Sequence, residues 1–129
     1  MLWSDQTVVV TLPGEVDITN ADAIREELLS VINQGAEIMI ADMSKTRFCD
    51  SAGVSTLVRA FRRATSSGTK MRLAVGGLAV ERVLTLTGVD RLIEVYPSVG
   101  AALGSPVSSS SADTSNSSGR SPGTTNGGG

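Results

Sequence analysis

Short apolar segments alternate with amphipathic ones along this chain, and this alternation constrains the fold more than any other feature of the sequence. The apolar segments are rich in Val, Ile and Leu on both faces, which is typical of strands in a sheet that is covered on both sides. They are residues 7–12, 37–41, 71–75 and 92–96. Parallel strands need a long crossover between them, usually a helix. The alternation therefore predicts an α/β fold with a mostly parallel sheet.

Helical periodicity fills the intervals between these strands. The first helix is predicted to begin at an N-cap, Thr19 or Asn20, and to stop at Gly35, and the second to run from Ser51 to Gly68. Their apolar stripes are Ala21, Ile24, Leu28, Val31 and Ile32 in the first helix and Val54, Leu57, Val58 and Phe61 in the second. A third helix over 78–87, a short fourth one ending at 103–104 and an edge strand at 2–3 complete the expectation. We therefore predict four to five strands and about four helices.

The last 25 residues have a different composition from the rest of the chain. Ser, Gly, Thr, Pro and Asn make up 21 of them, including four consecutive serines at 108–111. Such a segment buries too little apolar surface to offset the entropy of ordering its backbone. We therefore expect one domain over residues 1–104 and a disordered tail over residues 105–129.

The composition excludes several function classes. The chain has no histidine and one cysteine, which removes Ser-His-Asp and Cys-His nucleophilic systems and nearly all catalytic zinc, iron and copper sites. The formal net charge of −2 argues against direct nucleic-acid binding, which depends on clustered Lys and Arg. No signal peptide is evident, and no apolar run approaches the roughly 18 residues of a membrane span. We expect a cytoplasmic protein with no cofactor and no metal.

The segment Asp50-Ser51-Ala52-Gly53 lies where a loop meets the second predicted helix. Asp50 and Ser51 are both good N-caps, so the plain interpretation of Ser51 is a helix cap. The alternative is a phosphorylation site, because a phosphate on an exposed serine there would meet free backbone N–H groups and the positive end of the helix dipole. The added charge of about −1.5 to −2 would make the surrounding surface strongly acidic.

Three motifs now support a family resemblance. They are residues 12–17 (LPGEVD), a turn after the first strand; residues 50–54 (DSAGV), before the second helix; and residues 93–99 (IEVYPSV), the last strand and the turn after it. In this order and at this spacing they resemble the STAS domain of anti-sigma factor antagonists, over essentially all of residues 5–104. The predicted order of strands and helices agrees with the fold of that family.

The resemblance implies a protein that acts by binding a partner and that catalyses no reaction itself. The unmodified form would bind an anti-sigma factor with serine kinase activity and free the sigma factor for transcription. Phosphorylation would end this association, and a metal-dependent serine phosphatase would restore it. Ser51 would be the phosphate acceptor, Asp50 its charged neighbour, and Gly53 the small residue that lets the partner approach. The expected partner-binding residues are Glu15, Asp17, Asp50, Ser51, Ala52 and Gly53, on a protein that is a monomer when free.

Other interpretations of the same residues stay open. Cys49 is either a small buried hydrophobic residue or a redox-sensitive thiol, whose pKa the nearby helix N-terminus would lower. A ligand-binding module of the same fold would take a nucleotide or an anion at the helix that starts at Ser51. A small hydrolase would use Ser51 with Asp50, although no base or oxyanion partner is identifiable in the sequence.

Overall fold

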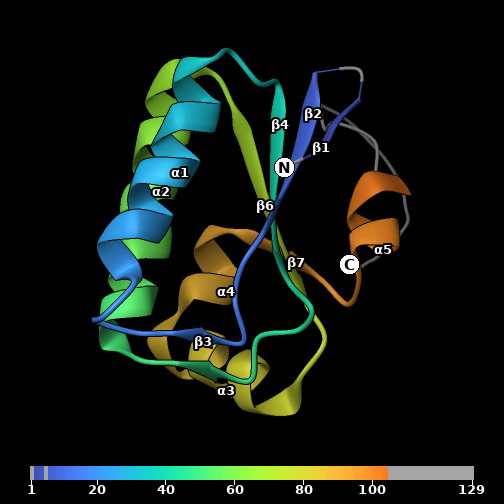
Figure 1. The fold of residues 1–129 in the computed structure, drawn as a ribbon. Coiled ribbons are helices and arrows are strands. Elements are labelled where there is room, and N and C mark those ends of the chain that lie inside the picture. Colours follow the sequence, from blue (N-terminus) through green and yellow to red (C-terminus); the bar gives the residue numbers. More distant parts are fainter. Residues whose placement is uncertain (1, 5, 105–129) are drawn as a thin grey trace.

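The computed structural model describes residues 2–4 and 6–104 and has a central five-stranded sheet in the order β1-β2-β4-β6-β7 (Figure 1). β1 is antiparallel to β2, and the other neighbours are parallel. A second sheet pairs β3 with β5. The strands are β1 (Leu2–Ser4), β2 (Thr7–Thr11), β3 (Glu15–Val16), β4 (Ile38–Met43), β5 (Phe48–Cys49), β6 (Lys70–Val75) and β7 (Glu94–Tyr96). The helices are α1 (Ala21–Asn33), α2 (Ser51–Ser67), α3 (Leu78–Thr87), α4 (Val89–Leu92) and α5 (Val99–Gly104).

The predicted α/β fold with a mostly parallel sheet is confirmed, including the antiparallel edge strand β1 and the bounds of α3. The one-turn helix α4 was not predicted, and β7 begins at Glu94, two residues after the predicted start of the last strand. The strands β3 and β5 were not predicted either, because two residues are too few for a periodic pattern. The predicted disorder of residues 105–129 lies outside the described residues.

The main core lies between the sheet and the pair α1 and α2, which pack against each other (Figure 1). All five residues of the predicted α1 stripe are buried. On α2 only Leu57 of the predicted stripe is fully buried, and Val54, Val58 and Phe61 are half-buried. The buried face of α2 is instead centred on residues that are mostly small. Small side chains allow the helix backbone to approach its neighbours closely. The residues of this face are Gly53, Thr56, Leu57, Ala60 and Ala64.

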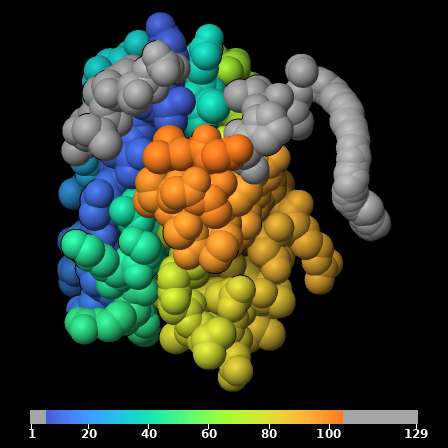
Figure 2. All heavy atoms as spheres, turned by 90° about the vertical axis from the view of Figure 1, so that its right-hand side faces the viewer, coloured from blue at the N-terminus to red at the C-terminus, as the bar shows by residue number. Residues whose placement is uncertain are grey.

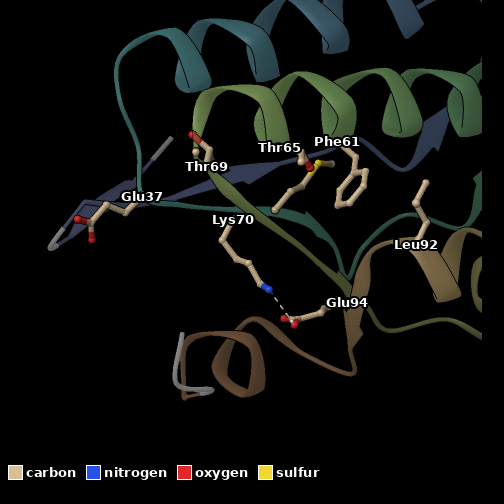
Figure 3. Close-up of a pocket in the computed structure, with 9 residues that line it drawn as sticks. Glu37, Phe61, Thr65, Thr69, Lys70, Leu92 and Glu94 are labelled. Carbon is tan, nitrogen blue, oxygen red and sulfur yellow. Dashed lines mark ion pairs between the residues drawn. The ribbon is translucent and has the colours of Figure 1, made fainter. Parts of the chain in front are cut away.

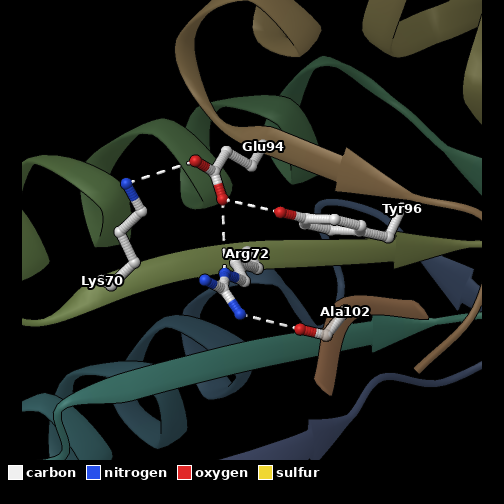
Figure 4. Close-up of polar contacts among 5 residues, drawn as sticks. All are labelled: Lys70, Arg72, Glu94, Tyr96 and Ala102. Atoms are coloured by element: carbon white, nitrogen blue, oxygen red, sulfur yellow. Dashed lines mark hydrogen bonds and ion pairs between the residues drawn. The ribbon is translucent and has the colours of Figure 1, made fainter. Parts of the chain in front are cut away.

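The opposite face of the sheet carries a smaller hydrophobic cluster, which lies beneath α5. Figure 2 shows the orange atoms of α5 at the centre of that side of the molecule. Arg72 of β6 points to this face and is 1% exposed. Its Nη1 donates to the Ala102 carbonyl oxygen of α5 at 2.7 Å, and its Nε lies 3.3 Å from the Glu94 carboxylate (Figure 4). The Arg72 guanidinium also lies 5.7 Å from the centre of the Tyr96 ring. One buried side chain therefore links α5 to β6 and β7.

We expect Arg72→Ala to destabilise the fold by about 2–3 kcal/mol, because it removes a buried hydrogen bond and the packing of a long side chain beneath α5. Urea unfolding measures the change in the free energy of unfolding. Arg82→Ala is the control, since Arg82 is exposed on α3 and has no polar contact within the described residues. Equal unfolding free energies for the two variants would contradict this account of α5.

Candidate functional site

The short sheet places the turn after β2 beside the start of α2. Glu15 pairs with Phe48 and Val16 with Cys49, in parallel. The Val16 carbonyl oxygen also accepts a hydrogen bond from the Asp50 N–H at 3.1 Å. Two segments more than 30 residues apart in the sequence therefore lie side by side. Asp17 directly follows Val16, the residue whose carbonyl oxygen accepts from Asp50. The structure brings together Glu15, Asp17, Asp50, Ser51, Ala52 and Gly53, and their role in binding a partner stays a prediction.

Asp50 is the N-cap of α2. Its backbone is extended, with φ −92° and ψ −173°, and its carboxylate accepts a hydrogen bond from the Gly53 N–H at 3.0 Å. Ser51 is consequently the first residue inside the helix, and its side chain is exposed. Within the described residues no hydrogen bond involves the Ser51 hydroxyl, and the Asp50 carboxylate is bonded to the Gly53 N–H instead. The capping role that the sequence left open between Asp50 and Ser51 belongs to Asp50.

Gly53 is buried and faces the chain's own β3 and β5. A Cβ atom at this position would lie 2.7 Å from Cys49 Sγ, 2.8 Å from Val16 Cγ1 and 2.9 Å from the Val16 carbonyl oxygen. The neighbour that needs Gly53 to be small is therefore the two-stranded sheet. Gly53 therefore lets α2 pack on Val16 and Cys49, and its expected role in letting a partner approach stays a prediction.

Asp17 organises the turn that leads from β3 into α1. Its backbone carbonyl accepts from the N–H groups of Asn20 and Ala21, at 3.2 and 2.8 Å. Its carboxylate accepts from the hydroxyl and the backbone N–H of Thr19, and these bonds lower the pKa of Asp17 below its usual value. The Asn20 side chain bonds back to β3, donating to the Glu15 carbonyl oxygen at 2.8 Å. The hydrogen bonds from Thr19 therefore stabilise the charged form of Asp17, which lies in the turn beside Asp50 and the start of α2.

Cys49 is buried, as the first interpretation of this residue predicted. Burial, with a smaller contribution from the Asp50 charge, raises the pKa of the Cys49 thiol to about 11. This shift is opposite to the lowered pKa expected for a redox-sensitive thiol, so it favours the interpretation of Cys49 as a small buried residue. The redox role stays a prediction.

Three large apolar side chains are exposed at the same end of the molecule as Ser51. Ile18 of the turn before α1 is 78% exposed, Phe48 of β5 is 52% exposed, and Leu78 at the start of α3 is 80% exposed. Figure 1 shows β3, β5, α3 and the start of α2 together at the lower end of the fold. The sequence analysis missed these residues, because periodicity does not determine which way a side chain faces in a turn, in a two-residue strand or at the first position of a helix. Exposed large apolar side chains that gather at one end of a molecule are a candidate protein-binding surface.

Another hollow lies away from this end of the molecule. It has a volume of about 740 Å³ and is lined by Phe61, Thr65, Leu92 and the ion pair of Lys70 with Glu94, whose charged atoms are 3.2 Å apart (Figure 3). Thr65 is 14 residues along α2 from Ser51, or about 21 Å at 1.5 Å per residue. This hollow is therefore separate from the end of the helix where the sequence suggested a nucleotide or anion.

Comparisons with known proteins identify the family. The STAS domain profile matches residues 3–102. The chain belongs to the STAS domain family. The anti-sigma-B factor antagonist of Bacillus subtilis is 25% identical over 92 residues, covering 71% of this chain and 84% of that protein. The crystal structure of an anti-sigma factor antagonist from Mycobacterium paratuberculosis has a TM-score of 0.73 at 25% identity, covering 79% of this chain and 86% of that one. A sulfate transporter family protein from Wolinella succinogenes shares the fold, with a TM-score of 0.70 at 18% identity and coverage of 80% and 86%.

We expect Gly53→Ala to destabilise the STAS domain by about 1–3 kcal/mol, because the new methyl group has no room against Val16 and Cys49. Gly100→Ala in α5 is the matched control, since its Cβ would meet nothing closer than 3.8 Å. Alanine favours a helix over glycine, so sterics alone accounts for a loss at Gly53. Urea unfolding distinguishes the two, and a Gly53→Ala protein as stable as the control would contradict the close packing.

We expect native Cys49 to react slowly with iodoacetamide at neutral pH. The thiolate is the reactive form, and raising the pKa from 9.0 to about 11 leaves about 100-fold less of it. The rate should climb as the pH rises from neutral towards 11, and unfolding in urea should remove the protection. Mass spectrometry of the alkylated protein measures the rate. Alkylation that is as fast in native buffer as in urea would contradict the burial of this thiol.

Proposed function

We propose that this STAS domain is an anti-sigma factor antagonist that is switched at Ser51. The unmodified protein binds an anti-sigma factor with serine kinase activity and thereby releases the sigma factor for transcription. The kinase phosphorylates Ser51 and ends the association, and a metal-dependent serine phosphatase restores it. The observation that carries the proposal is the exposed Ser51 hydroxyl, which has no hydrogen bond in the described part of the chain and lies at the same end of the molecule as three exposed apolar side chains.

Both states of this switch have a physical basis. In the unmodified state Ile18, Phe48 and Leu78 offer apolar surface that a partner can bury around Ser51. A phosphate at the first position of α2 would face unpaired backbone N–H groups and the positive end of the helix dipole, so the domain can accommodate it. It would also add a charge of about −1.5 to −2 beside the carboxylates of Asp17 and Asp50. A partner fitted to the neutral serine would then face repulsion and an unpaired phosphate.

The antagonist function fits this chain better than the role of a transporter domain. Identity to proteins named as anti-sigma factor antagonists reaches 29%, against 18% and 23% for two domains of sulfate transporter proteins. No helix in the described part of the chain is long and apolar enough to cross a membrane. The antagonist would work in the cytoplasm as a monomer, with a protein partner and without direct contact to nucleic acid or membrane. It would bind and be modified, and would catalyse no reaction.

We expect Ser51→Glu to weaken binding to the anti-sigma factor at least about tenfold, because it places a carboxylate where the partner meets a neutral hydroxyl. Ser51→Ala should bind and resist the kinase. Because Asp50 supplies the cap, Ser51→Ala should change the free energy of unfolding by less than about 0.5 kcal/mol. Ser66→Glu is the control for charge, since Ser66 is exposed at the far end of the same helix.

The measurement uses purified candidate anti-sigma kinases from the same genome. Calorimetry gives the dissociation constants, and intact-mass spectrometry with site mapping after incubation with ATP locates the phosphate. Phosphate on Ser51 together with loss of binding supports the switch. Binding that is equally tight for wild type, Ser51→Glu and the phosphorylated protein would overturn the switch, and no binding to any candidate would overturn the antagonist function.

A further inference from the structure

A groove between the amino-terminal halves of α1 and α2 begins one residue after Ser51. Its volume is about 320 Å³, and Ala52 and Ser55 of α2 form one wall with Ile18 and Ala21 opposite. These walls are mostly short side chains, so the helices leave an opening where longer residues would fill it. Because Ala52 belongs both to the expected partner-binding residues and to the groove, the groove continues the surface around Ser51.

The α2 wall carries a regular row of residues. Ser51, Ser55 and Arg59 follow one another at intervals of four, which places them one above the other along the helix. All three are exposed. A partner segment that contacts Ser51 and extends along α2 would therefore meet Ser55 and then Arg59.

The charge of the groove is positive on a protein whose formal net charge is −2. Its charged residues are Arg25, Arg59 and Asp22. Arg25 lies 3.4 Å from Asp22, so these two charges offset each other. Arg59 has no ion pair or hydrogen bond within the described residues, and it supplies the unbalanced positive charge. Asp50 directly precedes Ser51, and Asp17 follows Val16, whose carbonyl oxygen accepts from the Asp50 N–H. Ser51 therefore has acidic residues at the start of α2 and Arg59 two turns along the helix.

We propose that this groove receives an acidic segment of the anti-sigma factor, with a carboxylate paired to Arg59 and an apolar side chain packed against Ile18 and Ala21. The inference rests on the proposed function and assigns Arg59 as a residue that selects the partner. The lining of the groove supports this occupant, because a basic groove with apolar residues in its walls would match a segment that carries an acidic and an apolar residue. It also explains how one phosphate releases the partner, because phosphorylated Ser51 would add negative charge at the groove entrance, where the acidic segment enters.

Charge reversal tests this inference with the same purified anti-sigma kinase that binds the wild type. Arg59→Glu should weaken binding at least about tenfold, because it sets a carboxylate against the acidic segment. Arg62→Glu is the matched control: it makes the same charge change on the same helix, is exposed, and lies outside the groove, 11 residues or about 16 Å from Ser51. We expect less than about a twofold effect for this control, and a smaller difference between the two variants at high salt.

The outcomes separate the inference from the proposed function. If Arg59→Glu binds as tightly as wild type while Ser51→Glu does not, the groove proposal fails and the antagonist function stands. If the wild type binds no anti-sigma factor, both fail. If the wild type self-associates and Arg59→Glu abolishes that association without affecting the partner, the groove holds a second copy and the proposal is overturned. Arg59→Gln, with thermal unfolding of every variant, replaces Arg59→Glu if the reversed charge disturbs folding.

Discussion

The position of the candidate phosphorylation site depends on the pairing of β3 with β5, which is only two residues long. The Val16 carbonyl oxygen accepts from the Asp50 N–H at 3.1 Å, so the pairing leads directly into the residue that begins α2. The Asp50 carboxylate then accepts from the Gly53 N–H at 3.0 Å. Gly53 completes the arrangement, because any larger residue would collide with Val16. These few interactions fix the start of a helix of 17 residues and hold the turn at Asp17 beside it.

Helix geometry gives the first residues of α2 different surroundings, so one side chain packs inside the fold while another is exposed. Successive helical residues point about 100° apart, so neighbours in the sequence face different surroundings. Ser51 is exposed, Ala52 is half-buried and Gly53 is buried. Because Asp50 caps the helix and Gly53 packs it, Ser51 has no structural task in the described part of the fold. A hydroxyl in that position can be covered or modified while the helix beneath it keeps its contacts.

The sequence predicted those parts of the fold that repeat along an element. Five apolar residues at helical spacing identified the buried face of α1, and alternation identified the parallel sheet. It could not assign the cap of α2, because Asp50 and Ser51 are adjacent and both residue types cap helices. It could not reveal which way Gly53 faces, since this depends on β3, a strand too short for any periodicity. The exposed side chain of Phe48 and the groove beside Arg59 likewise arise only once distant segments are packed together.

The same local arrangement determines which charges can act on Ser51. Exposed charges farther apart than about 8 Å are largely screened at physiological ionic strength, so the formal net charge of −2 says little about a partner at this surface. The charges nearest Ser51 are the carboxylates of Asp50, which precedes it, and of Asp17, which the short sheet holds beside the start of α2. Arg59 lies two helical turns along α2, about 12 Å away, so it acts on a partner segment that extends along the helix rather than on Ser51 itself. The hydrogen bonds from Thr19 lower the pKa of Asp17 and stabilise its charged form. A change in the charge of Ser51 is therefore the event best placed to alter the balance at this surface.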